Sequence, residues 1–96
     1  MGHGRELEDL REQIRKVTVE IIKLCGKRLS LAERAGEMKL AKCLPIEDSD
    51  VEEELRQAVL ENCHLYCVDS EFGTRLLDLL LEESKSLQRN IVNQRR

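Results

Sequence analysis

Residues 7–38 read LEDLREQIRKVTVEIIKLCGKRLSLAERAGEM and decide the fold of this chain. Large apolar side chains return in this stretch at alternating steps of three and four residues, which is the heptad pattern of an α-helix that packs along one face. The pattern breaks at Arg28, where a leucine is expected. Because arginine stays charged, burying it requires an anionic partner from the protein or from a ligand. The seam consists of Leu7, Leu10, Ile14, Val17, Ile21, Leu24, Arg28, Leu31, Ala35 and Met38.

Composition restricts the class of protein. The chain has 96 residues, of which 36% are charged, and we predict one domain over residues 1–96. Such a composition is typical of a helical protein with solvated faces. A net charge of −3 without a basic stripe argues against nucleic-acid binding. No apolar run is long enough to span a membrane and no signal peptide precedes the first helix, so we expect a cytoplasmic protein.

Four cysteines raise the question of a metal site. Cys63 and Cys67 could lie on one helical face beside His64, whereas Cys25 and Cys43 lie elsewhere. Structural zinc usually requires two pairs of closely spaced ligands, and the second pair is missing. The sequence therefore predicts no metal, and thiols that are buried and reduced.

Helical patterning covers nearly the whole chain. Pro45 ends the first pattern because proline disfavours helix at the residue before it. Ser49 and Glu52 have the spacing of a capping box at the start of a second helix. Asp69 or Ser70 is suited to cap a third helix. The sequence thus predicts an all-α fold with three helices per chain, over about residues 6–42, 49–66 and 70–92.

The length of the first helix adds a constraint. A helix of about 37 residues is roughly 55 Å long. A compact chain of this size has a radius of gyration of about 12–13 Å, so this helix must extend beyond its own domain. Because its seam is apolar from end to end, the extension needs a partner. We predict that the partner is the same helix of a second copy, which gives an intertwined homodimer.

A second cation follows Arg28 on the same helix. Lys39 lies 11 residues further on, so three helical turns separate two cations that point nearly the same way. Gly36 lies between them, where glycine costs about 1 kcal/mol relative to alanine. We interpret this glycine as a place where another group approaches the backbone closely.

Three further polar residues could join these cations. Ser84 falls on the apolar stripe of the third helix, Gln88 follows one turn later, and Glu52 begins the second helix. Together the five groups suit a small, multiply charged anion that carries a hydroxyl group. Each also has a purely structural interpretation: Arg28 could pair with an acid of a second copy to set the register, and Lys39 could stabilise the C-terminus of its helix.

Six short sequence motifs along the chain resemble those of one protein family. They are Leu10-Arg11-Glu12-x-Ile14, Lys27-Arg28-x-x-Leu31-Ala32, Gly36-x-x-Lys39, Pro45-Ile46-x-Asp48, Glu52, and Leu81-Glu82-Glu83-Ser84-x-x-x-Gln88. Over about residues 7–90 the chain resembles the all-helical (AroQ-class) chorismate mutases. The resemblance implies an isomerase that converts chorismate to prephenate in aromatic amino-acid (Phe/Tyr) biosynthesis, as a homodimer.

The resemblance also implies roles for individual residues. Arg28, and Arg11 reaching in from the other subunit, would bind the two carboxylates of chorismate, and Ser84 would assist at a carboxylate. Lys39 and Gln88 would donate hydrogen bonds to the ether oxygen of the C–O bond that breaks.

The resemblance also implies residues that bind the ring hydroxyl of chorismate. Glu52, together with the backbone near Asp48, would hold this group. Two positions depart from the pattern, because Glu47 and Val51 stand where many relatives have arginines. The missing positive charge at these positions predicts weaker binding of one substrate carboxylate.

The reaction requires no nucleophile, base, metal or cofactor, and the sequence predicts none. Two alternatives remain at this point. An isochorismate-pyruvate lyase on the same fold would use similar cations, although such lyases tend to lack the acid at Glu52. A non-enzymatic helical dimerisation module would use Arg28 only to set register. No fused catalytic segment is apparent, so we expect a monofunctional enzyme.

Overall fold

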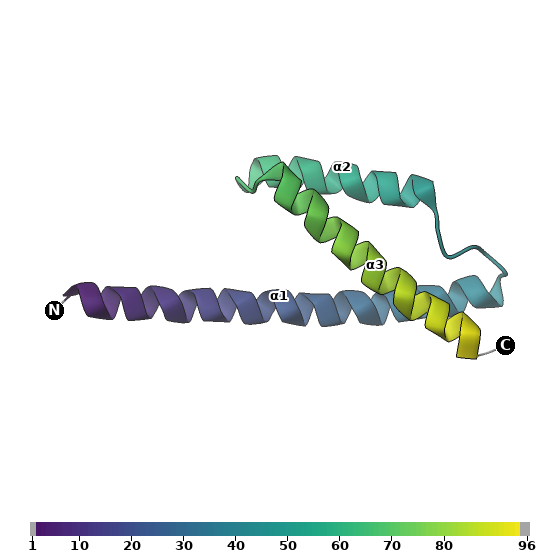
Figure 1. The fold of residues 1–96 in the computed structure, drawn as a ribbon, viewed down its shortest axis with the longest axis horizontal. Helices are drawn as coiled ribbons and strands as arrows, with labels where there is room; N and C mark the ends of the chain where they lie inside the picture. Colours follow the sequence, from purple (N-terminus) through teal and green to yellow (C-terminus); the bar gives the residue numbers. More distant parts are fainter. Residues whose placement is uncertain (1, 95–96) are drawn as a thin grey trace.

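The computed structural model describes residues 2–94, so the predicted domain of residues 1–96 extends past the described part at both ends. Three helices make up the fold: α1 (Gly2–Ala41), α2 (Ser49–Leu65) and α3 (Ser70–Gln94) (Figure 1). The prediction of an all-α, three-helix chain is confirmed. None of the described helices combines the length and apolar character that crossing a membrane requires.

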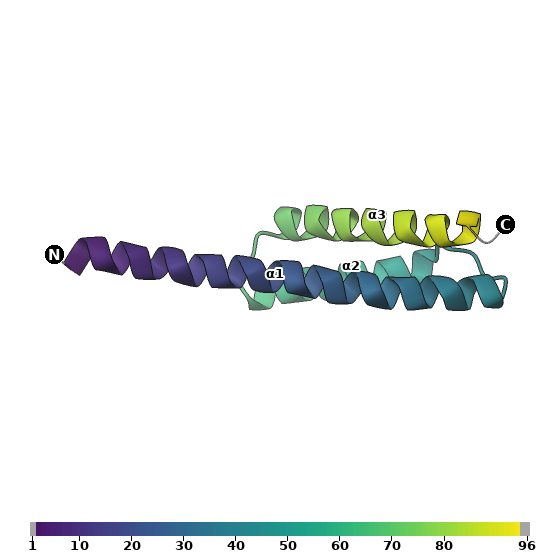
Figure 2. The same cartoon turned by 90° about the horizontal axis from the view of Figure 1, so that it is seen from below.

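The helices form an extended arrangement in which α3 contacts both of the others. The C-terminal half of α1 packs against α3, and α2 packs against α3. The N-terminal half of α1 extends past both of them, as two perpendicular views show (Figures 1 and 2). The chain measures 63 × 28 × 15 Å and has a radius of gyration of 17.8 Å. A compact chain of this length would have about 12.5 Å, so the predicted extension of the first helix is confirmed.

Most of the apolar seam lies on the surface of the single chain. On the extended part of α1, Leu10, Ile14 and Val17 are between 55% and 65% exposed. The apolar side chains that are buried within residues 4–94 are Cys63, Leu77 and Ile91. The accessible surface is 8023 Å², whereas a compact monomer of this mass exposes about 5,700 Å². One chain therefore leaves much more surface in water than a compact domain does, and large apolar side chains of α1 are among the exposed groups.

Two helices end in the same way, with a cysteine in an unusual conformation. Cys43 follows α1 and Cys67 follows α2, with φ angles of 55° and 56°. In the Schellman motif the second residue past the helix end donates back to the third-last helical carbonyl, and Leu44 N bonds to Lys39 O at 2.8 Å in this way. Val68 N bonds to Cys63 O at 2.9 Å in the second motif.

The prediction that the cysteine thiols are buried is wrong for the two cysteines in these motifs. Cys63 is buried and Cys25 is half-buried, but Cys43 and Cys67 are exposed. The two exposed cysteines occupy the left-handed position just past a helix end, where the chain turns at the surface. All four thiols are free.

The start of α2 also differs from the prediction. Asp48 is the N-cap, and its carboxylate accepts hydrogen bonds from Asp50 N at 3.1 Å and Val51 N at 3.3 Å. The predicted capping box from Ser49 to Glu52 is therefore wrong. At the start of α3, the carboxylate of Asp69 accepts a hydrogen bond from Phe72 N at 3.0 Å, so Asp69, one of the two predicted candidates, caps this helix.

Candidate active site

A pocket of about 300 Å³ lies where α1, α3, the loop after α1 and the start of α2 meet. Aliphatic side chains, including Leu31, Leu55 and Leu81, form much of its wall. A volume near 300 Å³ is at the lower end of the range for pockets that bind small molecules. The polar residues that the sequence singled out and the structure brings together here are Arg28, Lys39, Asp48, Glu52, Ser84 and Gln88.

Arg28 is half-buried in this pocket and is held by oxygen atoms of α3. Its Nη1 donates hydrogen bonds to the backbone carbonyl of Leu80, at 3.0 Å, and to the hydroxyl of Ser84. The Ser84 hydroxyl donates in turn to Leu80 O at 3.0 Å. Both acceptors of the guanidinium are neutral, so its positive charge is oriented but not compensated.

Lys39 and Gln88 form a second polar pair across α1 and α3. Lys39 Nζ donates to Ile46 O at 2.7 Å and to Gln88 Oε1 at 3.2 Å. Gln88 is only 5% exposed, and its Nε2 donates to Ala32 O at 2.9 Å. An ammonium group has three donors and a carboxamide nitrogen has two. Each residue therefore keeps one donor that these bonds do not use.

The two cations differ from the ion-paired residues elsewhere. None of the ion pairs in the described part of the chain involves Arg28 or Lys39. Their partners are backbone carbonyls, a hydroxyl and an amide oxygen. Two positive charges in a partly desolvated, aliphatic pocket create a strong local preference for an anion.

Glu52 and Asp48 lie at the α2 side of the pocket. Glu52 is half-buried, and its Oε1 lies 2.6 Å from Lys85 Nζ. Asp48 is exposed and its carboxylate is engaged in capping α2. The carboxylate of Asp48 is therefore committed to the helix end.

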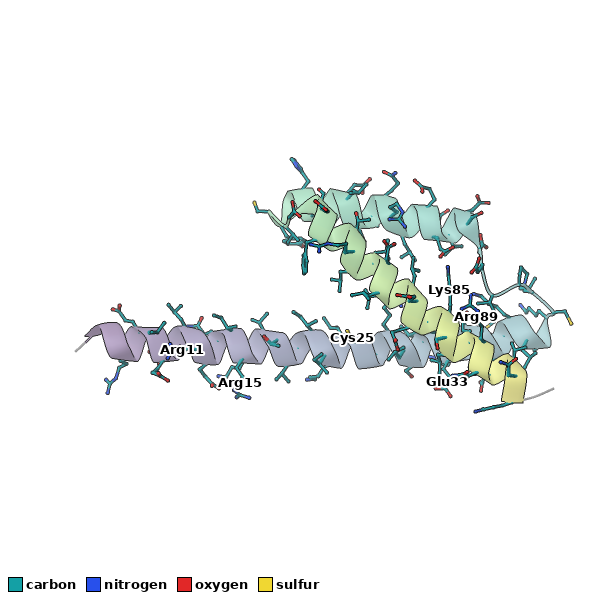
Figure 3. The ribbon with its side chains drawn as sticks, in the orientation of Figure 1. Arg11, Arg15, Cys25, Glu33, Lys85 and Arg89 are labelled. Carbon is teal, nitrogen blue, oxygen red and sulfur yellow. The ribbon has the colours of Figure 1, made fainter. Side chains whose placement is uncertain are left out.

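Lys85 is a pocket residue that the sequence analysis missed. Its Nζ also lies 3.6 Å from Glu47 Oε1, and Glu47 pairs in addition with Arg89 at 3.2 Å. Figure 3 shows Lys85 and Arg89 on the side of α3 that faces α2 and the preceding loop. The hydrogen bond with Glu52 raises the pKa of Lys85 above its ordinary value, with a smaller electrostatic contribution from Glu47. The sequence did contain one indication of this position: Lys85 precedes Gln88 by three residues and therefore shares its helical face.

Arg11 lies far along α1 from its own chain's pocket. The residue is exposed on the extended half of the helix, which Figure 3 shows beyond α2 and α3. Its Nη1 pairs with Glu8 Oε1 at 3.1 Å, in an i,i+3 contact of the kind that contributes little to stability. The single chain therefore does not bring Arg11 to the other six predicted residues.

The model of the family described as chorismate mutase type II matches residues 10–89, a span that includes all seven predicted site residues. The chain belongs to the chorismate mutase type II family. The predicted resemblance is confirmed, and so is the prediction of an isomerase at the level of this family.

Individual relatives differ in length. A chorismate mutase of Methanocaldococcus jannaschii is 28% identical over 89 residues, which are 93% of this chain and 90% of that protein. A bifunctional chorismate mutase/prephenate dehydratase of Escherichia coli is 29% identical over 85 residues, which are 88% of this chain and 22% of that protein. The bifunctional protein of Aquifex aeolicus is 38% identical over 55 residues, 57% of this chain and 15% of its own length. This chain therefore spans less than a quarter of these bifunctional relatives.

The polar groups of this family member suit chemistry that depends on binding and charge. Within residues 2–94, no group of three or more His, Cys, Asp and Glu side chains is placed to hold a metal ion. The pocket instead offers hydrogen-bond donors on Arg28, Lys39 and Gln88, held in place by α1, α3 and the intervening loop. Fixed donors of this kind can restrain a flexible anion and stabilise negative charge that develops on it.

Proposed function

We propose that this protein converts chorismate to prephenate in the pocket described above, as a step in the biosynthesis of phenylalanine and tyrosine. The observation that carries the proposal is that Arg28 and Lys39 lie in the same pocket and that the hydrogen-bond partners of both are neutral oxygen atoms. Chorismate is a dianion, so its carboxylates can compensate these two cations, which have no carboxylate partner of their own. The family membership supports the same substrate.

The proposed catalytic mechanism needs no covalent step. Chorismate rearranges when its chain folds over its ring, and the pocket would restrain the flexible dianion in that chair-like form. Negative charge builds on the ether oxygen as the C–O bond stretches. Lys39 and Gln88 each retain a donor for this oxygen, and both are held by other hydrogen bonds before the substrate arrives. Such preorganised donors stabilise the transition state more than the ground state.

The remaining residues would bind the parts of chorismate that do not react. Arg28 would hold one carboxylate, and Ser84, which already orients the guanidinium, would assist it. Glu52 would accept a hydrogen bond from the ring hydroxyl, with the backbone near Asp48 beside it. The half-buried position of Glu52 at the pocket wall supports this role.

We propose further that the active unit is an intertwined homodimer in which Arg11 enters the pocket of the partner chain. The exposed seam on the extended half of α1 supports this arrangement, because Leu10, Ile14 and Val17 need an apolar partner. The chain exposes about 40% more surface than a compact monomer of its mass. Covering that excess on two chains gives an interface in the size range of obligate homodimers. Arg11 would then bind the second carboxylate of chorismate.

Two further parts of the proposal concern the surroundings of the reaction. We propose that the enzyme works without a metal or cofactor, because the rearrangement needs only restraint and charge stabilisation. Free thiols at Cys43 and Cys67 are exposed, which suits a reducing compartment, and we propose a cytoplasmic location.

A direct assay tests the proposed function. The purified protein is incubated separately with chorismate and with isochorismate, and the products are identified. We expect chorismate to disappear and prephenate to form at a rate far above the uncatalysed one. Release of pyruvate from isochorismate without prephenate formation would instead identify a lyase, and a stable chorismate concentration would reject the proposal.

A further inference from the structure

We propose that Lys85 is a substrate-binding residue that supplies the pocket's third positive charge from α3, at the wall where Val51 on α2 supplies none. The inference rests on the proposed function and deepens it. Both residues line the same pocket, and Val51 directly precedes Glu52, the ion-pair partner of Lys85.

The position of Lys85 differs from that of an ordinary surface lysine. Its side chain is 24% exposed, whereas the side chain of Lys23 on α1 is 69% exposed. The ammonium group is anchored by Glu52 at 2.6 Å, and Glu47 lies at 3.6 Å, too far for a direct hydrogen bond. Since an ammonium has three donors, the contact with Glu52 leaves donors that can reach a ligand.

The charges that line the pocket favour the same conclusion. Arg28, Lys39 and Lys85 are positive, and Asp48 and Glu52 are negative, so the chain's own pocket has one surplus positive charge. Without Lys85 the surplus would be zero. With Lys85 present and Arg11 added from a partner chain, the net charge of the pocket becomes +2, which matches a dianion. Lys85 therefore decides whether the pocket can compensate the full charge of its substrate.

The ion pair also gives Lys85 a stable charge. The hydrogen bond with Glu52 raises the pKa of Lys85, so the ammonium stays protonated throughout the pH range in which the enzyme would work. The same contact uses Oε1 of Glu52, so the second oxygen of this side chain can accept a hydrogen bond from a hydroxyl group.

A purely structural role is the alternative, because Lys85 and Glu52 connect α3 with α2. The chain contains a matched contact of that kind outside the pocket: Arg56 on α2 pairs with Asp78 on α3 at 3.1 Å. Removing either cation breaks one ion pair between the same two helices, and removing Lys85 also ends its longer contact with Glu47 in the loop before α2. Only the removal of Lys85 also removes a charge from the pocket.

The experiment compares Lys85→Met with Arg56→Met in steady-state kinetics with chorismate. We expect Lys85→Met to raise KM about tenfold or more with a smaller effect on kcat, because a charge-assisted contact to the substrate is lost. Arg56→Met should leave KM within about twofold of the unmodified enzyme. Lys85→Arg should largely retain the KM of the unmodified enzyme, since it keeps the charge.

A second substitution on the opposite wall of the pocket tests whether the effect on KM depends on the lost positive charge. Adding Val51→Arg to Lys85→Met places a cation on α2 in the same pocket, and we expect it to restore most of the lost affinity. An unchanged KM in Lys85→Met, or a KM that Val51→Arg does not restore, would overturn the proposal. If Lys85→Met does not fold, Lys85→Gln serves for the same comparison, with circular dichroism as the check.

Failure of this inference and failure of the proposed function are distinguishable. The unmodified enzyme is assayed first, and absence of chorismate turnover there rejects the proposed function. With turnover established, an unaltered KM in the Lys85 variants rejects only the role of Lys85.

Discussion

Gly36 and Gln88 fit together so closely that no side chain can stand between them. A Cβ atom on Gly36 would lie 2.8 Å from Cγ of Gln88 and 3.3 Å from Cδ1 of Ile91. The missing side chain lets α3 approach α1, and Gln88 can then reach Ala32 O and Lys39 Nζ. The interpretation of this glycine as a point of close approach is confirmed, and the approaching group is one of the predicted site residues.

The variant Gly36→Ala should therefore impair catalysis although alanine favours helix. The added methyl group must displace Gln88 from its present position, and we expect kcat to fall about tenfold or more because misplaced donors lose transition-state stabilisation. Gly26→Ala is the matched control, because a Cβ at Gly26 on the same helix meets nothing within 4 Å. Steady-state kinetics of both variants provide the test. Equal activity of the two would show that the position of Gln88 does not matter.

Loss of the ammonium group at Lys39 should have a larger effect. In Lys39→Ala the pocket loses the donor that we assign to the ether oxygen. Removing one preorganised donor typically lowers kcat by about 100-fold or more, which corresponds to about 2.7–4 kcal/mol. The measurement is kcat for chorismate, with circular dichroism to verify folding. Nearly normal turnover in a folded variant would refute the role of Lys39.

A change at Gln88 should alter the pH dependence of the rate. An amide does not titrate in the working range, whereas Gln88→Glu introduces a carboxyl that donates a hydrogen bond only when it is protonated. Activity of this variant should therefore rise as the pH falls through the pKa of the new carboxyl. The check is a kcat profile between about pH 4 and 8 beside that of the unmodified enzyme. A flat profile in the variant would mean that this position does not contact the reacting oxygen.

The turn after α2 offers a prediction about stability. Cys67 has a φ of 56°, a conformation that glycine adopts without strain. We expect Cys67→Gly to raise the free energy of unfolding by up to about 1 kcal/mol, because the left-handed strain of an L side chain is removed. Cys67→Ala keeps that strain and should bring no such gain. Urea denaturation of the two variants measures the difference, and equal stability would argue against strain at this turn.

Much of the fold was predictable because periodicity and helix length are properties of the sequence itself. The seam around Arg28 predicted the first helix, and its length required an extension beyond the domain, as the chain's 63 Å extent confirms. The N-cap of α2 was not predictable in the same way. Asp48 and Ser49 are both good capping residues, and the preference between them is small. Glu52, which completed the capping-box pattern, pairs with Lys85 instead.

The pocket was predictable only in part. Arg28, Lys39, Ser84 and Gln88 stood out because they interrupt apolar stripes or follow them at helical spacing. Lys85 interrupts nothing, and a lysine in a charged segment of a helix is usually a solvated residue. Its place in the pocket depends on where α2 starts and how α3 crosses it, which are tertiary relationships.

We propose that two chains build each pocket, and this arrangement can be examined by subunit complementation. Arg11→Ala and Lys39→Ala are each expected to be nearly inactive as homodimers. After unfolding and refolding together, mixed dimers contain one pocket with both Lys39 and the partner's Arg11. We predict recovery of about a quarter of the unmodified activity, since half of the dimers are mixed and each has one complete pocket. Mixed dimers that form but remain inactive would show that Arg11 does not complete the pocket of the partner chain.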